Sequence, residues 1–193
     1  AHMREVFAAM LPLLSKLQGL DKHPLLEGVA FVPCLPADDA TDGVDLYAPR
    51  SAAFRAQQTH RALSPVIGLV KPGDQTIKLI AEAAGVAKEP RADVLAAALD
   101  APEGEEGEEA PVSTDLAVAL AIELAVRLRA KEPRPAKVVV PTVLNTVRDV
   151  GAVFIDDAPW QSEKAMVTLH PRISAEDGRM LGCSSLREEM TRQ

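Results

Sequence analysis

Two segments of the chain share one pattern that restricts how the chain can fold. The first is AFVPCLPADDATDGVDLYAP, from Ala30 to Pro49, and the second is VVVPTVLNTVRDVGAVFIDDAP, from Val138 to Pro159. In each, an apolar strand ends at a Pro, a polar loop follows, and a second strand leads to an acidic residue and Ala-Pro. Pro33 to Pro49 spans 16 positions and Pro141 to Pro159 spans 18. The pattern predicts two similar lobes with a β-hairpin packed on helices in each. The alternative is a chance likeness between two short segments.

The rest of the chain is mainly helical in pattern. Apolar residues recur at helical spacing in five places, and Gly or Pro marks several of their ends. These segments are residues 4–20, 51–62, 74–84, a helix that opens at Glu89-Pro90, and residues 113–131. We therefore predict an α/β fold of the α+β type, with two helix-plus-β-hairpin lobes and a helical middle segment.

Composition suggests where the lobes begin and end. Ala1-His2-Met3 reads as the remnant of an expression tag, residues 4–100 as the first lobe with its helical segment, and residues 113–193 as the second lobe. Between them, residues 101–112 include five glutamates and little apolar surface, so we expect a disordered acidic loop there. Deleting residues 101–110 should barely change thermal stability, because the segment has almost no apolar surface to bury. An alternative function places the activity in this acidic run, as a docking segment for a basic partner.

Charge and cysteine usage exclude several classes of protein. The net charge is −7 and no basic face is visible, so neither nucleic acid nor an anionic membrane is an expected partner. The longest apolar helix is interrupted by Glu123 and Arg127 and is too short to cross a bilayer. Cys34 and Cys183 lack metal-ligand spacing, and two thiols in a chain of 193 residues are typical of a reduced, cytoplasmic protein.

Few side chains suggest catalysis. His170 ends an apolar strand before Pro171, where a ring nitrogen can bond the backbone, and no nucleophile is spaced to partner it. Asp156 and Asp157 read as turn residues before a Pro. The only Trp, Trp160, is either a buried plug or an anchor for a partner. The main alternative is a small enzyme or ligand-binding domain whose site is assembled from distant residues, namely Cys34, His60 and His170.

The C-terminal part of the chain resembles a repeat found in sacsin-like giant chaperones. That repeat contains a DAPW run, matched here by Asp157 to Trp160, and then an HPxIS…LG..SL run, matched by His170 to Leu186. An earlier "FVP…LY.P" strand pair in the family is matched by Phe31 to Pro49, so the order agrees over nearly the whole chain. Ala48 departs from the pattern, because the family usually has Asp there.

The resemblance implies a function that composition alone does not. It implies a non-catalytic structural and interaction module of a large multidomain chaperone, flanking ATPase lobes. Its expected partners are clients, co-chaperones and neighbouring domains of the same chain, and Asp157, Pro159, Trp160 and His170 are the candidate partner-binding or lobe-locking residues. The family's ATP-binding lobe carries an Asn-Ala-Asp-Asp helix signature and Gly-rich loops, which this sequence lacks. We therefore expect no cofactor and no catalytic residue.

Overall fold

The chain divides into two compact units, Ala1–Arg91 and Ala92–Gln193. The computed structural model describes residue 9 and residues 28–36, 43–64, 66–100, 113–157 and 167–192. Helices and short strands in separate small sheets make this a mixed α+β architecture, as the sequence predicts. The predicted helix at 4–20 and the acidic loop at 101–112 lie outside the described residues, apart from residue 9, which is helical.

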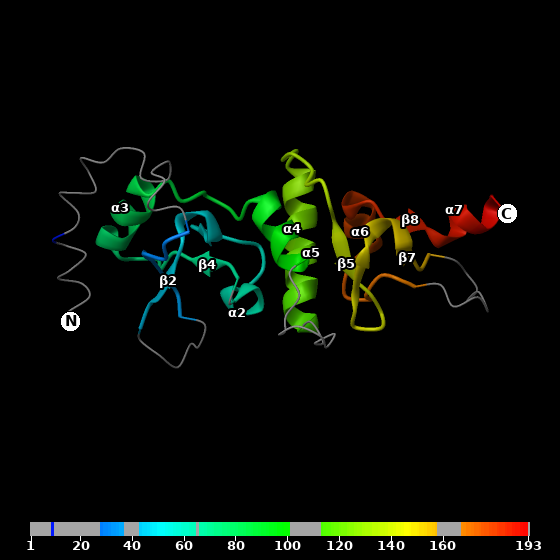
Figure 1. Ribbon diagram of the computed structural model, residues 1–193, viewed down its shortest axis with the longest axis horizontal. Helices are drawn as coiled ribbons and strands as arrows, with labels where there is room; N and C mark the ends of the chain where they lie inside the picture. The colour runs from blue at the N-terminus through cyan, green and yellow to red at the C-terminus, as the bar shows by residue number, and fades with distance from the viewer. Residues whose placement is uncertain are drawn as a thin grey trace. The chain divides into compact units, whose positions relative to one another are not determined.

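The first unit contains four short strands and two short α-helices among its described residues (Figure 1). Its elements are β1 (Val32–Cys34), β2 (Asp45–Tyr47), η2 (Pro49–Ser51), β3 (Ala52–Ala53), α2 (His60–Leu63), β4 (Gly68–Leu69) and α3 (Gln75–Ala83). β1 and β2 form an antiparallel hairpin, whereas β3 and β4 pair in parallel. A single bridge from Cys34 to Val70 connects the two strand pairs, and another joins Ala53 to Ala87. α3 packs against β1.

The predicted helix over 51–62 is wrong. That stretch instead contains η2, β3 and the four-residue helix α2. The reason is nonlocal pairing, since Ala52 and Ala53 are held by Gly68 and Leu69, which lie far along the sequence. Helical propensity decides little where a strand partner of this kind is available.

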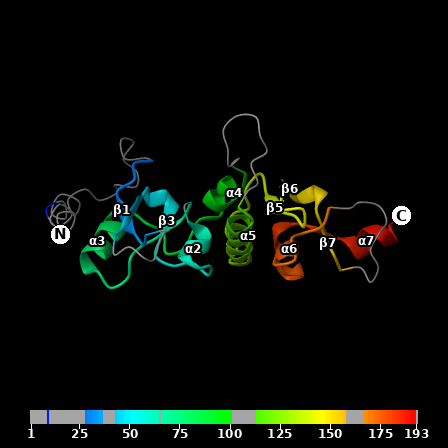
Figure 2. The ribbon, with the colours of Figure 1, turned by 90° about the horizontal axis from the view of Figure 1, so that it is seen from below.

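The second unit contains α5, the longest helix among the described residues, and repeats the strand arrangement of the first unit. Its elements are α4 (Ala92–Asp100), α5 (Thr114–Arg129), β5 (Val139–Pro141), β6 (Val147–Asp149), η3 (Val150–Ala152), β7 (Phe154–Ile155), α6 (Ala175–Leu181), β8 (Ser184–Ser185) and α7 (Leu186–Thr191). α5 packs on α4, α6 and β5 (Figure 2), and 11 of its 16 residues are buried. The sequence-based division groups residues 92–100 with the first lobe, whereas the structure packs them as α4 on α5.

Equivalent hydrogen bonds show that the two units share one topology. In the first unit, the hairpin β1–β2 is followed by η2, β3, a central strand formed by β4 and Val70, then α3 and the bridge from Ala53 to Ala87. In the second unit, the hairpin β5–β6 is followed by η3, β7, a central strand segment at Thr168 and Leu169, then α6 and β8, which pairs with β7. The matching backbone bonds are Val70 N to Ala53 O (2.9 Å) and Leu169 N to Phe154 O (2.9 Å), Leu35 N to Leu69 O (2.7 Å) and Val143 N to Thr168 O (3.0 Å), and Val86 N to Ala81 O (3.0 Å) and Cys183 N to Gly178 O (2.9 Å). The sequence repeat therefore extends over a whole structural unit.

The structure corrects how the repeat aligns. Pro33 faces Leu46 and Pro141 faces Val147, so the first prolines correspond as predicted. From there, however, Pro49 corresponds to Val150 and not to Pro159. The hairpin loop is shorter in the second unit, and the Ala-Pro after the second strand is therefore not the equivalent of Ala48-Pro49.

The helix that follows the central strand has the same start and end in both units. The Asp74 side chain accepts hydrogen bonds from Thr76 N (2.9 Å) and Ile77 N (3.2 Å) at the start of α3. Ser174 does the same for Asp177 N (3.0 Å) at the start of α6. Gly85 (φ 71°) and Gly182 (φ 101°) then end the helices in the left-handed conformation that glycine adopts without strain. For α3, the caps confirm the bounds 74–84 that the sequence predicts.

Candidate functional site

The His170 side chain serves the local backbone. Its Nδ1 accepts a hydrogen bond from Arg172 N (3.3 Å), and its own amide donates to Pro141 O (3.0 Å). The ring is buried, and burial, followed by the nearby Arg172 cation, lowers the pKa of His170 from its ordinary value against the opposing charge of Asp115. A neutral ring that accepts at Nδ1 carries its proton on Nε2. His170 thus holds the turn between the central strand and α6.

Asp157 connects the end of β7 to the start of α7. Its Oδ1 accepts hydrogen bonds from Ser185 Oγ (2.9 Å) and Arg187 N (3.1 Å), while its Oδ2 accepts one from Arg179 Nη2 (3.3 Å). Ser185 is the N-cap of α7 and accepts from Glu188 N (3.2 Å). The carboxylate and the hydroxyl together therefore satisfy two of the free amides in the first turn of α7. We call Asp157, Ser185 and the Arg187 amide the α7 clasp.

The charge on Asp157 is stabilised in this position. Burial acts to raise the pKa of its carboxyl, but the hydrogen bonds from Ser185 and the Arg187 amide and the charge of Arg179 outweigh it and lower the pKa. His170 and Asp157 have separate sets of partners, so the structure gives them separate tasks within the second unit. Pro159 and Trp160, the other two predicted residues, lie outside the described residues.

Both thiols lie in the core. Burial, followed by the nearby Asp45 carboxylate, raises the pKa of Cys34 to about 12. Burial raises the pKa of Cys183 to about 11, against the opposing charge of Arg134. Both residues are free thiols, and the thiolate is the nucleophilic form, so these positions disfavour reactivity. Cys34 and His60 belong to the first unit and His170 to the second.

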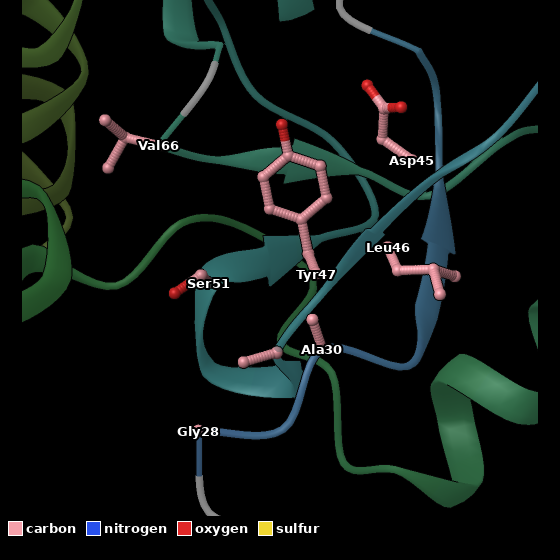
Figure 3. A pocket seen from close by; sticks show the side chains of 8 residues that line it. Gly28, Ala30, Asp45, Leu46, Tyr47, Ser51 and Val66 are labelled. Carbon is pink, nitrogen blue, oxygen red and sulfur yellow. The ribbon is translucent and has the colours of Figure 1, made fainter.

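A hollow at the surface of the first unit is a feature that sequence reasoning missed. Its volume is about 530 Å³, and eight described residues line it, seven of them labelled in Figure 3: Gly28, Ala30, Asp45, Leu46, Tyr47, Ala48, Ser51 and Val66. Asp45 and Tyr47 lie two positions apart on β2, so both side chains project from one face of the strand. The signal available in the sequence was that Tyr47 is the chain's single Tyr and follows an Asp at strand spacing.

The described part of the chain contains neither a cluster of metal-ligating side chains nor a helix that could span a membrane. No group of three or more His, Cys, Asp or Glu side chains in that part of the chain is placed to hold a metal ion. Among the helices described, none is both long enough and apolar enough to cross a membrane.

Comparison with known proteins identifies no relative. No protein-family model matches the chain, and neither a curated protein nor a solved structure matches it.

Proposed function

We propose that the chain is a non-catalytic interaction module of a large, multidomain, cytoplasmic chaperone of the sacsin-like kind. In this role it flanks ATPase lobes and binds proteins, whether clients, co-chaperones or neighbouring domains. The observation that carries the proposal is the use of the motif residues. Asp157, His170 and Ser185 all hold the backbone of the second unit, which is what a binding platform requires of its buried polar groups.

The caps of α6 support the same view. Ser174 and Gly182, which belong to the matching motif, start and end α6. Arg134 adds to this end of the helix, because its guanidinium donates to the carbonyl oxygens of Met180 and Leu181. The motif residues thus act together to fix one helix and its flanking strands. A rigid support of this kind suits an interaction module, in which surface groups remain available for a partner.

Aggregation of an unfolded model protein tests the proposal. The chain is added at equal molar ratio to a thermally unfolding enzyme of unrelated sequence, and light scattering is followed with and without Mg-ATP. We expect the chain to delay scattering equally in both conditions, and calorimetry with Mg-ATP to detect no binding. Binding of Mg-ATP in the micromolar range, or its hydrolysis, would contradict the non-catalytic assignment. Scattering unchanged by the chain would contradict client binding.

A further inference from the structure

The hollow beside Tyr47 is placed and lined to receive a positively charged group. Asp45 contributes a carboxylate, Tyr47 an aromatic ring with its hydroxyl, and Ser51 a second hydroxyl, while none of the described lining residues is basic. In Figure 3 the Tyr47 ring stands between Asp45 on one side and Val66 and Ser51 on the other. Aromatic faces and carboxylates both attract cations. The hollow is wide open to solvent, so a side chain that projects from another protein can enter it.

Burial and charge near the ring agree with this description. Burial raises the pKa of Tyr47 above its ordinary value, against the opposing effect of a hydrogen bond with the Ser64 side chain, and the Asp45 carboxylate adds to the rise. The negative charge of Asp45 therefore acts at the phenol, and a cation that entered the hollow would be attracted by the same charge. The Tyr47 ring also packs closely against the backbone of Gly68. A Cβ added at Gly68 would collide with the ring and would lie 2.7 Å from Cys34 Sγ.

The second unit shows that the fold does not require these side chains. The strand register makes Asp45 equivalent to Thr146, Tyr47 to Arg148, and Ser51 to Ala152. Arg148 occupies the position of Tyr47 in the equivalent hairpin of the second unit, and its side chain is exposed. The backbone hydrogen bonds that follow the two hairpins match. Because the second unit forms the same topology with Arg148 at the position of Tyr47, the fold does not depend on the Asp45 and Tyr47 side chains. These two side chains are therefore available for a role other than folding.

We propose that the hollow formed by Asp45, Tyr47 and Ser51 binds the side chain of a Lys or Arg presented by a partner protein. The site lies at the surface, with Gly28, Ala30 and Asp45 exposed and Leu46 41% exposed, so a projecting side chain can reach it. The aliphatic stem of a Lys packs on the Tyr47 ring while its ammonium reaches the Asp45 carboxylate. This inference rests on the proposed function, because it names the partner chemistry of an interaction module.

The single Tyr makes the test specific. Protein labelled with ¹³C in the Tyr ring gives one ring spin system, which reports on this site alone. The probes are Nα-acetyl-lysine N-methylamide, the same compound acetylated at Nε, and n-butylamine. We expect the Tyr47 signal to shift with the charged lysine compound and with n-butylamine, which reproduces the whole Lys side chain, and to shift little with the neutral compound.

Variants separate the pocket from general electrostatics. Asp45→Asn should weaken binding of the charged probe about threefold, because an exposed ion pair contributes modestly. Asp156→Asn, which removes an exposed negative charge from the second unit, should leave binding unchanged. Equal shifts with the charged and neutral compounds, or full binding in a folded Asp45→Asn variant, would overturn the proposal. Failure of n-butylamine to shift the Tyr47 signal at concentrations where the lysine compound shifts it would overturn the assignment of the contacts to the side chain.

The two proposals fail in different ways. If the chain delays aggregation but the Tyr47 signal ignores the charged probe, the interaction module stands and the cation pocket is wrong. If the probe binds at Tyr47 but the chain leaves aggregation unchanged, the pocket stands and client binding is wrong.

Discussion

Replacing Asp157 by Ala removes the acceptor at the centre of the α7 clasp. Two donors then lose their partner, namely Ser185 Oγ at 2.9 Å and the Arg187 amide at 3.1 Å. Hydrogen bonds to a charged group contribute about 1.5–3 kcal/mol each when they are well buried. The Asp157 side chain is 21% exposed, so water replaces part of the loss. The pair with Arg179 adds little, because that cation is 58% exposed.

We therefore expect Asp157→Ala to lower the free energy of unfolding by about 2 kcal/mol. For a chain of this length the melting temperature should then fall by about 4–8 °C. The effect should be local in origin, since α7 has only six residues and a helix of that length depends on its cap. Hydrogen exchange should accelerate first at the amides of Arg187 and Glu188, which the clasp protects.

The pH dependence of stability independently tests the role of the Asp157 carboxylate. The pKa of Asp157 is lowered in the folded chain from its ordinary value of 3.8. The ionised Asp157 carboxylate therefore contributes fully to the free energy of unfolding above pH 3.8. This contribution is lost as the pH falls through the lower pKa that Asp157 has in the folded chain. The stability difference between the parent and Asp157→Asn should be constant near neutrality and should shrink below about pH 4. Asp156→Ala is the matched control and should change stability by less than about 0.5 kcal/mol. If Asp157→Ala leaves both stability and Arg187 exchange unaltered, the clasp does not hold α7.

Two further predictions concern the other buried groups. Because the pKa values of Cys34 and Cys183 are raised to about 12 and about 11, neither thiol should react with DTNB at pH 8 until denaturant is added, and rapid labelling of the native chain would contradict their burial. The lowered pKa of His170 means that stability should fall as the pH drops below its ordinary value of 6.5, and His170→Asn, which keeps an acceptor for the Arg172 amide, should remove that part of the loss when urea unfolding is compared at pH 7.5 and 5.5.

Local signals in the sequence predicted the elements whose causes are local. α3 and α6 were both predictable, because Asp74 and Ser174 start them and Gly85 and Gly182 end them. The first strands of the two hairpins, β1 and β5, followed from apolar runs that end at Pro. Each of these assignments depends on neighbours within a few positions along the chain.

Pairing between distant residues accounts for what the sequence did not show. β3 has two residues, which is too short for any periodic signal, and only its partners in β4 make it a strand. The α7 clasp joins Asp157 to Ser185 across 28 positions, so the sequence could suggest only that Asp157 lies in a turn. The hollow beside Tyr47 likewise depends on Val66, which the first hairpin does not contain.

Two fragments of the second unit test which residues form its core. Residues 92–193 include α4, whereas residues 113–193, the lobe predicted from sequence, lack it. α4 buries Leu95 and Leu99 completely or nearly so, at 0% and 1% exposure, and it packs on α5. The Ala92 amide donates to Glu132 Oε2 at 3.1 Å, and Lys137 pairs with Asp100 at 2.5 Å, so residues beyond α5 hold both ends of α4.

Without α4, the facing side of α5 is exposed to water. The two leucines alone account for about 3–6 kcal/mol of burial, a large part of the 5–15 kcal/mol that stabilises a typical domain. We expect residues 92–193 to unfold cooperatively in urea and residues 113–193 to lack a cooperative transition while keeping some helical circular dichroism. An equal midpoint and slope for the two fragments would show that α4 is dispensable. The core of the second unit would then consist of α5, α6 and the strands alone, and the unit would begin at α5, as the sequence first suggested.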